Sequence, residues 1–214
     1  MASQELDAVV GMLRAGRFWR RDLTLQERRA QLDQAPGLLP PVEGVAAEAA
    51  TVAGLPAMWF GAPGAAREPA VLYLHGGAYQ LGSVPSHGRL ASALALAAGA
   101  SALVVEYRLA PEHPHPAAVE DAVAAWRWLL DQGHDPARLA VAGDSAGGGL
   151  TIAALVAARD AGLPLPAAAV ALSPWVDLEG LGESVRTRAA LDPMLDPAGM
   201  PRESAPYLGG HRPP

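Results

Sequence analysis

The strongest chemical signal in the chain is Ser145, which stands at the centre of the pentapeptide Gly143-Asp144-Ser145-Ala146-Gly147. An apolar run at 139–142 precedes the pentapeptide and an Ala-rich segment follows it, so the sequence predicts a strand, a tight turn and a helix. Glycines two positions to either side leave room for a strained turn that projects the serine hydroxyl above a sheet. The helix expected from Ala146 directs free N–H groups and its positive dipole end at negative charge developing there. We therefore predict that Ser145 is a nucleophile.

A second element supplies backbone hydrogen-bond donors. The apolar run at 70–74 ends in His75-Gly76-Gly77-Ala78, whose small residues leave the amides approachable. Taken alone, the two glycines also fit an ordinary turn, but their place before the serine element favours an oxyanion hole. Each donor to the oxygen of a tetrahedral intermediate lowers the barrier by about 3 kcal/mol. The predicted donors are Gly76, Gly77, Ala78 and Ala146, with His75, Gly143, Asp144 and Gly147 supporting the loop and the turn.

The elements that must position these residues alternate along the chain. Continuous apolar runs at 70–74, 102–105, 139–142 and 167–172 are typical of strands buried on both faces. Helical segments at 86–98, 117–131 and 146–161 lie between them, and two β-like runs at 47–53 and 55–60 precede them as an expected hairpin. The pattern predicts an α/β fold with a mostly parallel sheet and helices on both faces.

A small helical region comes first. Leu6, Val9 and Leu13 are spaced as on an amphipathic helix, and a second helix is expected from Leu25 because Thr24 and Glu27 have capping-box spacing. A Pro/Gly-rich stretch at 36–44 separates these helices from the rest.

Composition excludes several classes of protein. The 214 residues are 50% hydrophobic and 18% charged, which is globular, and a net charge of −6 argues against a nucleic-acid partner. Without Cys there is no disulfide, thiol nucleophile or zinc–thiolate site, and without Lys no P-loop, kinase or Schiff-base chemistry. Glu5 and Asp7 do not suit a signal peptide, and no run of 18 apolar residues predicts a membrane span. We therefore expect a soluble cytoplasmic protein.

Together with two further stretches, these motifs resemble the hormone-sensitive-lipase-type branch of the α/β-hydrolases, a family of serine carboxylesterases. The matching stretches are YLHGGAY (73–79), YRLAPE (107–112), GDSAGG (143–148) and SPWVDL (173–178). The resemblance implies a helical cap at 1–44, an α/β-hydrolase core at 45–214, and hydrolysis of short-chain small-molecule esters through a Ser145 acyl-enzyme without a cofactor. The family usually has a third Gly where Ala78 stands, but an alanine amide is the same donor.

The chain departs from the family after the serine. In α/β-hydrolases an Asp or Glu and then a His follow the serine, and the family places both beyond two further strands. The sequence predicts no strand after 167–172, no later carboxylate matches the family's acid motif, and His211 is the only later His. His211 lies three residues from the end, a poor place to hold a base. We therefore expect an incomplete triad in a C-terminally shortened esterase that lacks its last strands.

That departure leaves alternatives open. The run at 167–172 would be an exposed apolar sheet edge, suited to self-association. Either the sequence was shortened in gene prediction or cloning, or the product is completed by another chain. Besides an esterase, the sequence fits a non-catalytic hydrolase-like binding protein, or an inactive truncated esterase.

The remaining candidates have structural interpretations. Glu120 and Asp121 are expected to offset the dipole of the helix they begin, and His113 and His115 to occupy a loop rather than a metal site. Trp175 fits a pocket wall and simple packing equally well. The family likeness gives Arg108 and Glu112 a bracing role at the oxyanion loop. A solvated helix face is expected for the N-terminal arginines Arg14, Arg17, Arg20, Arg21, Arg28 and Arg29.

Overall fold

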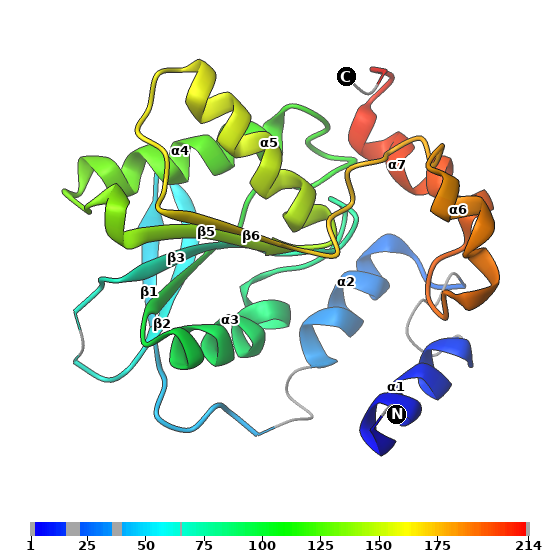
Figure 1. Ribbon diagram of the computed structural model, residues 1–214, viewed down its shortest axis with the longest axis horizontal. Helices are drawn as coiled ribbons and strands as arrows, with labels where there is room; N and C mark the ends of the chain where they lie inside the picture. The colour runs from blue at the N-terminus through cyan, green and yellow to red at the C-terminus, as the bar shows by residue number, and fades with distance from the viewer. Residues whose placement is uncertain (1–2, 16–21, 36–39, 65, 213–214) are drawn as a thin grey trace.

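The computed structural model describes residues 3–15, 22–35, 40–64 and 66–212, which fold around a six-stranded sheet (Figure 1). The strands lie in the order β1-β2-β4-β3-β5-β6. The last four of these run parallel, whereas β1 and β2 form an antiparallel hairpin whose second strand pairs antiparallel with β4. Their bounds are β1 Ala46–Val52, β2 Leu55–Gly61, β3 Ala70–Leu74, β4 Ser101–Val105, β5 Leu139–Asp144 and β6 Ala168–Leu172.

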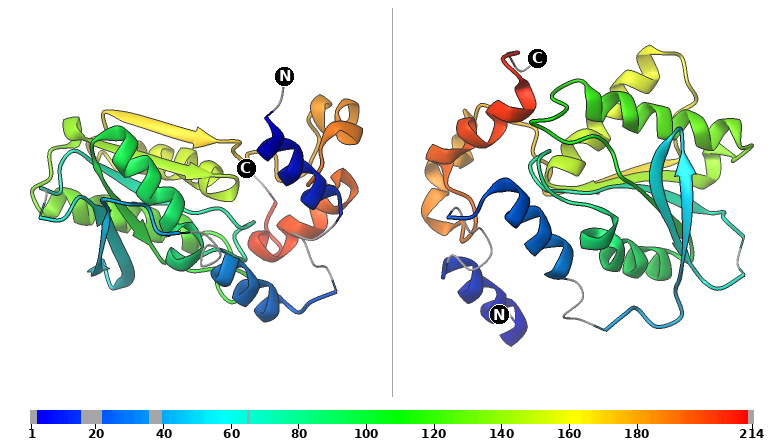
Figure 2. Two further views of the ribbon diagram at one scale, coloured as in Figure 1. Left: turned by 90° about the horizontal axis from the view of Figure 1, so that it is seen from below. Right: turned by 180° about the vertical axis from the view of Figure 1, so that it is seen from behind.

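Helices cover both faces of the sheet. Figures 1 and 2 show α3 on one face and the packed pair α4 and α5 on the other. This arrangement confirms the predicted α/β architecture, and the predicted core elements agree with the observed ones to within two residues at each end. The helices are α1 Gln4–Arg14, α2 Leu25–Gln34, α3 Val84–Ala98, α4 Ala117–Asp131, α5 Ala146–Asp160, α6 Glu183–Thr187 and α7 Met200–Leu208. Short 3₁₀ turns are η2 Pro136–Arg138, η3 Ala189–Leu191 and η4 Pro197–Gly199.

Local sequence chemistry explains several boundaries. Ala53 and Gly54 both have positive φ, +50° and +85°, as a two-residue hairpin turn between β1 and β2 requires. The predicted capping box of α2 is present, with Thr24 accepting from the Glu27 amide and the Glu27 carboxylate accepting from the Thr24 amide. Gly99 ends α3 in the left-handed conformation that glycine adopts at low cost.

The core lies on both faces of the central strands. Leu72, Leu103 and Val141 belong to the larger cluster of buried side chains, which α4 and α5 cover. Tyr73 and Val104 point to the other face, where they pack with residues of α3. Strands β3, β4 and β5 therefore have the two-sided burial that their continuous apolar sequences predict.

Strand β6 differs from the other parallel strands. It lies at the sheet edge, and the side chains of Val170 and Leu172 are 46% and 36% exposed. The interpretation of 167–172 as a strand buried on both faces is therefore wrong, whereas the exposed apolar edge is confirmed. Within the described residues no strand follows β6.

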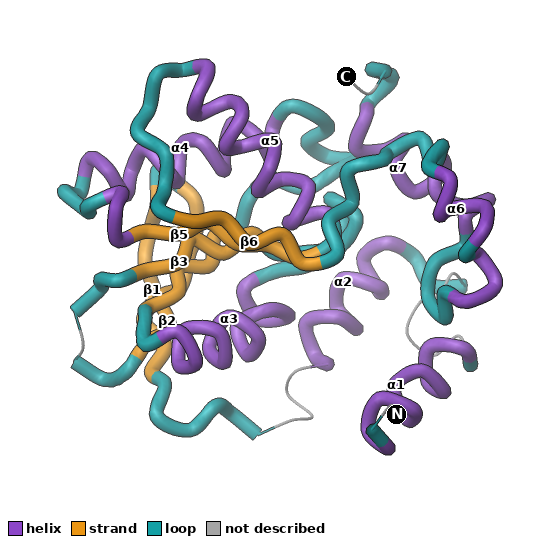
Figure 3. The backbone as a smooth tube through the Cα atoms, in the orientation of Figure 1, coloured by secondary structure: helices purple, strands orange, loops and turns teal. Residues whose placement is uncertain are grey.

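Four helices lie apart from the sheet. Figure 3 shows α1, α2, α6 and α7 gathered beyond the carboxyl ends of the parallel strands. From here on we call these four helices the cap, a larger group than the helical cap expected at 1–44. The carboxyl ends of such strands are where ligands bind in α/β folds. The side chains of α1 are not buried, and Leu6, Val9 and Met12 are exposed. No helix within the described ranges is long and apolar enough to cross a membrane.

Candidate active site

Ser145 occupies a strained turn between β5 and α5. Its backbone has φ +53° and ψ −119°, a conformation that non-glycine residues adopt only where the surrounding structure imposes it. The Ser145 amide donates to Leu172 O at 2.9 Å, and the Ser145 carbonyl accepts from the amides of Gly149 at 3.0 Å and Trp175 at 2.8 Å. The segment that follows β6 therefore holds the turn in place from one side.

Glycines flank the serine because the backbone passes too close for a side chain. A Cβ at Gly147 would lie 2.0 Å from Leu74 O, and a Cβ at Gly143 would lie 2.3 Å from Gly147 O. A Cβ at Gly149 would likewise lie 2.3 Å from Trp175 O. The helix thus approaches both β3 and the segment after β6 at a distance that only glycine permits.

Residues 75–82, here called the oxyanion loop, follow β3. Gly77, Ala78 and Tyr79 have positive φ of +123°, +56° and +60°, so the loop turns sharply. The Gly77 carbonyl accepts from the amides of Gln80 at 3.0 Å and Leu81 at 2.8 Å, which closes the turn. Among the described residues, none accepts a hydrogen bond from the amides of Gly77 and Ala78, so both remain available as donors.

Gly76 differs from the sequence prediction. Its amide donates to Asp144 Oδ1 at 3.0 Å, and a Cβ at this position would lie 2.3 Å from Asp144 Oδ2. Because Asp144 already accepts this N–H, the interpretation of Gly76 as an oxyanion donor is wrong. Gly76 joins the oxyanion loop to the serine turn instead.

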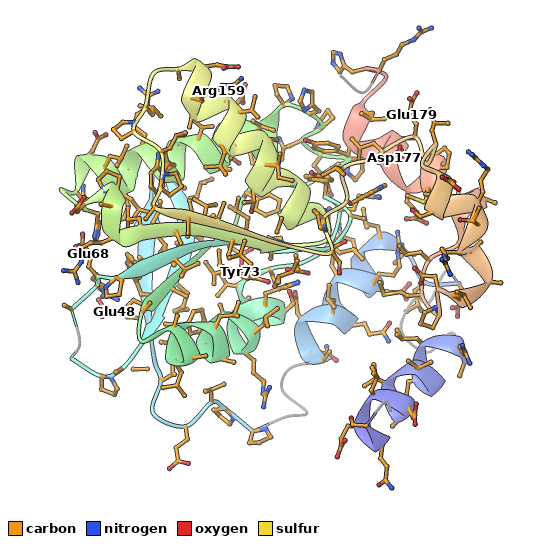
Figure 4. The ribbon with its side chains drawn as sticks, viewed as in Figure 1. Glu48, Glu68, Tyr73, Arg159, Asp177 and Glu179 are labelled. Carbon is orange, nitrogen blue, oxygen red and sulfur yellow. The ribbon has the colours of Figure 1, made fainter. Side chains whose placement is uncertain are left out.

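Asp144 is the centre of a partly buried polar network. Its Oδ1 accepts from the Tyr73 hydroxyl at 2.7 Å as well as from Gly76, and its Oδ2 lies 3.5 Å from His87 Nε2. Burial raises the pKa of Asp144, but the hydrogen bonds from His87, Tyr73 and Gly76 and the charge of His87 together hold that pKa below its usual value. Burial beside this carboxylate raises the pKa of Tyr73, which therefore donates as a neutral phenol. Figure 4 labels Tyr73 in the centre of the sheet.

His75 is the buried first residue of the oxyanion loop. It is fully buried, and its ring stacks on Tyr107 with 4.2 Å between centroids. Its Nδ1 lies 2.9 Å from the Gly76 carbonyl, which can only accept, so Nδ1 carries the proton. Burial, and then the neighbouring charge of His87, lowers the pKa of His75 to about 3, so the ring is neutral at physiological pH.

Within the described residues, no histidine or carboxylate is hydrogen-bonded to the Ser145 hydroxyl. His211 lies beyond α7 with its ring 6.3 Å from that of His115, and its side chain is exposed. His115 itself joins its loop to α7, because its amide donates to Tyr207 O at 2.7 Å.

Two arginines have roles that the sequence interpretation missed. Arg29 is not on a solvated face: its guanidinium donates to Gln80 O and forms a two-pronged pair with Glu112, both bonds 2.8 Å long. Asp121 is buried and binds Arg108 at 2.7 Å, so its role as a simple dipole partner is wrong. Arg108 thereby anchors its loop to α4, whereas Glu112 is linked to the oxyanion loop through Arg29. Arg17, Arg20 and Arg21 lie outside the described residues.

The aromatic surroundings of the site come from three segments. Tyr79 of the oxyanion loop stacks on Tyr207 of α7 with 3.7 Å between ring centroids, and Trp175 lies 6.4 Å from Tyr79. The Trp175 indole N–H donates to Asp177 O at 3.0 Å. A groove of about 720 Å³ between the β1–β2 hairpin and α3 contains no residue of the oxyanion loop or the serine turn.

The geometry is that of an α/β-hydrolase: a strained serine turn follows a central parallel strand and is joined through Asp144 to the glycine-containing loop after β3. Residues 71–212 match the model of a family described as alpha/beta hydrolase fold. An acetyl-hydrolase of Streptomyces hygroscopicus is 47% identical over 213 residues, covering 100% of this chain and 71% of that protein. A putative acetyl-hydrolase of Mycobacterium tuberculosis is 40% identical, covering 97% of this chain and 68% of its own length.

A solved structure agrees. The crystal structure of an esterase from the bacterial hormone-sensitive lipase family superposes with a TM-score of 0.91 at 49% identity, covering 100% of this chain and 71% of that one. The chain therefore belongs to the α/β-hydrolases, and within them to the carboxylic ester hydrolases of the hormone-sensitive-lipase type. It spans about 70% of the length of these relatives.

Proposed function

We propose that the chain hydrolyses short-chain esters of carboxylic acids through an acyl-enzyme on Ser145. The observation that carries this proposal is the pairing of the strained Ser145 turn with the free amides of Gly77 and Ala78. The amide of Ala146, at the first position of α5, has no acceptor within its own helix and is the third proposed donor. Two relatives are named acetyl-hydrolases, which supports a short acyl group.

The proposed reaction divides hydrolysis into two transfers. Ser145 Oγ attacks the ester carbonyl carbon, and the carbonyl oxygen gains negative charge that the three amides stabilise. The C–O bond to the alcohol then breaks, the alcohol leaves with a proton, and water later cleaves the acyl-serine. The hydroxyl proton needs an acceptor during the attack, and among the described residues no histidine is hydrogen-bonded to the Ser145 hydroxyl.

This missing contact supports a second candidate. A hydrolase-like protein that binds an ester or acid without cleaving it would keep the loop and the serine turn but would need no base. The two candidates differ in the reactivity of Ser145, because only an activated serine attacks an electrophile quickly.

The first test is hydrolysis of p-nitrophenyl butyrate by the full chain and by Ser145→Ala. We expect the wild-type chain to release p-nitrophenol faster than buffer does, and we expect the variant to lose that excess completely. A fluorophosphonate should add one adduct to the wild type, by intact mass, and none to the variant. Ser184→Ala, an exposed serine of α6, is the matched control and should behave as wild type.

Equal turnover and equal labelling of wild type and Ser145→Ala would contradict the esterase proposal. Tight binding of a short-chain ester without turnover would then favour the non-catalytic candidate. We also propose, from the sequence alone, that the protein is located in the cytoplasm.

We also propose that the free edge of β6 pairs with the same edge of a second copy. Val170 and Leu172 are exposed there, and β6 contains no proline or charged residue that would prevent pairing. Val170→Lys should therefore shift the chain toward monomer in size-exclusion chromatography with light scattering. The control is Ile152→Lys, which removes an exposed apolar side chain of α5 away from the β6 edge and should leave the oligomeric state unchanged. A wild-type chain that stays monomeric at high concentration would contradict this proposal.

A further inference from the structure

Gln80 is the point at which two cap helices reach the oxyanion loop. Its side chain is buried, with 6% exposure. Arg29 Nε of α2 donates to the Gln80 carbonyl at 2.7 Å, and Gln80 Nε2 donates to the Glu203 carbonyl of α7 at 2.9 Å. The two helices are more than 160 residues apart in the sequence, yet both bind the same loop residue.

Arg29 also binds the neighbouring loop that follows β4. Its Nη2 donates to Ala110 O at 3.0 Å, and Nη1 and Nη2 each donate to a Glu112 oxygen at 2.8 Å. The Ala110 amide in turn donates to Tyr79 O at 2.8 Å. The hydrogen bonds from Arg29 hold the pKa of the Glu112 carboxyl down to about 2, so this carboxylate is charged at neutral pH. One guanidinium thus joins α2, the oxyanion loop and the loop after β4.

The loop needs such support because its conformation is strained. Ala78 and Tyr79 are consecutive non-glycine residues with left-handed φ, and Gln80 follows them directly. Residues in this region of the backbone keep it only where their surroundings impose it. The Gly77 carbonyl accepts from the Gln80 amide, so any displacement of Gln80 also moves Gly77.

We propose that Arg29 is a positioning residue for the oxyanion hole: by holding Gln80 from the cap, it sets the amides of Gly77 and Ala78 in the orientation that the oxyanion requires. This inference rests on the proposed function. Within the described residues Arg29 makes no hydrogen bond to the serine turn. It holds the oxyanion loop directly at Gln80 O, and indirectly through Ala110, whose amide donates to Tyr79 O. Through this contact the cap influences the stabilisation of the transition state.

The first readout does not depend on activity. Hydrogen exchange of the Gln80 and Leu81 amides, which both donate to Gly77 O, should become about tenfold faster in Arg29→Gln. The reason is that this variant removes hydrogen bonds from a charged group, which oppose local opening of the loop. Arg159→Gln is the matched control: its guanidinium pairs with Asp160 on the solvent-exposed end of α5, far from the cap in Figure 4. Exchange in that variant should equal that of the wild type.

The second readout is the separation of kcat from KM for p-nitrophenyl butyrate. Loss of oxyanion geometry should lower kcat about tenfold in Arg29→Gln and leave KM within about twofold, since the amides act on charge that develops only in the transition state. Arg29→Lys keeps the charge but has a single donor nitrogen in place of the three of the guanidinium, so it should recover part of kcat. This variant also replaces Arg29→Gln for both readouts if the glutamine variant does not fold.

The outcomes separate this inference from the proposed function. A wild-type chain with no Ser145-dependent turnover would contradict the proposed function. Hydrogen exchange of the Gln80 and Leu81 amides would then be the one test of whether Arg29 holds the loop. Unchanged exchange in Arg29→Gln would overturn the inference. Unchanged kcat despite faster exchange, in a wild-type chain that is active, would also overturn it while leaving the esterase intact.

Discussion

Gly147→Ala is expected to lower the free energy of unfolding by about 3 kcal/mol or more, the range of severe overpacking. The new methyl group would lie 2.0 Å from Leu74 O and 2.5 Å from His75 O. Both contacts are with backbone atoms at the end of β3, which pairs with β4 on one side and β5 on the other. Because these atoms cannot rotate away as a side chain would, α5 or the strand has to move.

Urea unfolding at neutral pH measures this effect as a lower midpoint with an unchanged slope. The matched control is Gly11→Ala, in the interior of α1, where no described atom outside the helix's own backbone and the two neighbouring residues lies within 4 Å of the added Cβ. There alanine should instead stabilise the helix, by up to about 1 kcal/mol at an exposed position. Equal midpoints for Gly147→Ala and the wild type would mean that α5 does not approach β3 as closely as described.

The elements of the core could be predicted because each one carries a local signal. The apolar runs of β3 and β4 are too short for helices and lack alternation, and the capping box at Thr24 marks the start of α2. The Ser145 turn has its signal in five consecutive residues. Such patterns depend on neighbours in the sequence, so sequence reasoning finds them.

The contacts that hold the oxyanion loop could not be predicted in this way. Arg29 and Gln80 are 51 residues apart, and Arg29 and Glu112 are 83 apart. The residues next to Arg29 in the sequence give no signal that distinguishes it from an N-terminal arginine on a solvated helix face. The same limit applies to Gly76, whose amide is occupied by a carboxylate 68 residues away.

The burial of Asp121 is a case in which a local signal was present but misleading. A carboxylate in the first turn of a helix fits the dipole interaction, and that explanation needs no distant partner. The Arg108 guanidinium that binds it comes from the loop after β4, 13 residues earlier. A buried carboxylate requires such a partner, but burial itself becomes visible only in the fold.

Asp144→Asn is expected to lower stability by about 2 kcal/mol at pH 7, the scale of hydrogen bonds to a charged group. Asparagine keeps one oxygen for the Tyr73 hydroxyl and the Gly76 amide, but it removes the charge and turns an amide group toward His87. The carboxylate is half-buried, so water replaces these partners poorly. Asp160→Asn, an exposed carboxylate at the end of α5, is the control and should change stability by less than about 0.5 kcal/mol.

The pH dependence identifies the charge as the cause. The folded-state pKa of Asp144 lies below its usual value, so the carboxylate contributes stability that is complete above the unfolded-state pKa of about 3.9 and is lost as the pH falls through the folded-state value. The difference in urea midpoint between wild type and Asp144→Asn should therefore persist from pH 7 to about pH 5 and shrink below about pH 4. A difference that stays the same at pH 3 would assign the loss to shape instead of charge. Because the Gly76 amide depends on this carboxylate, the same variant should also loosen the link between the serine turn and the oxyanion loop.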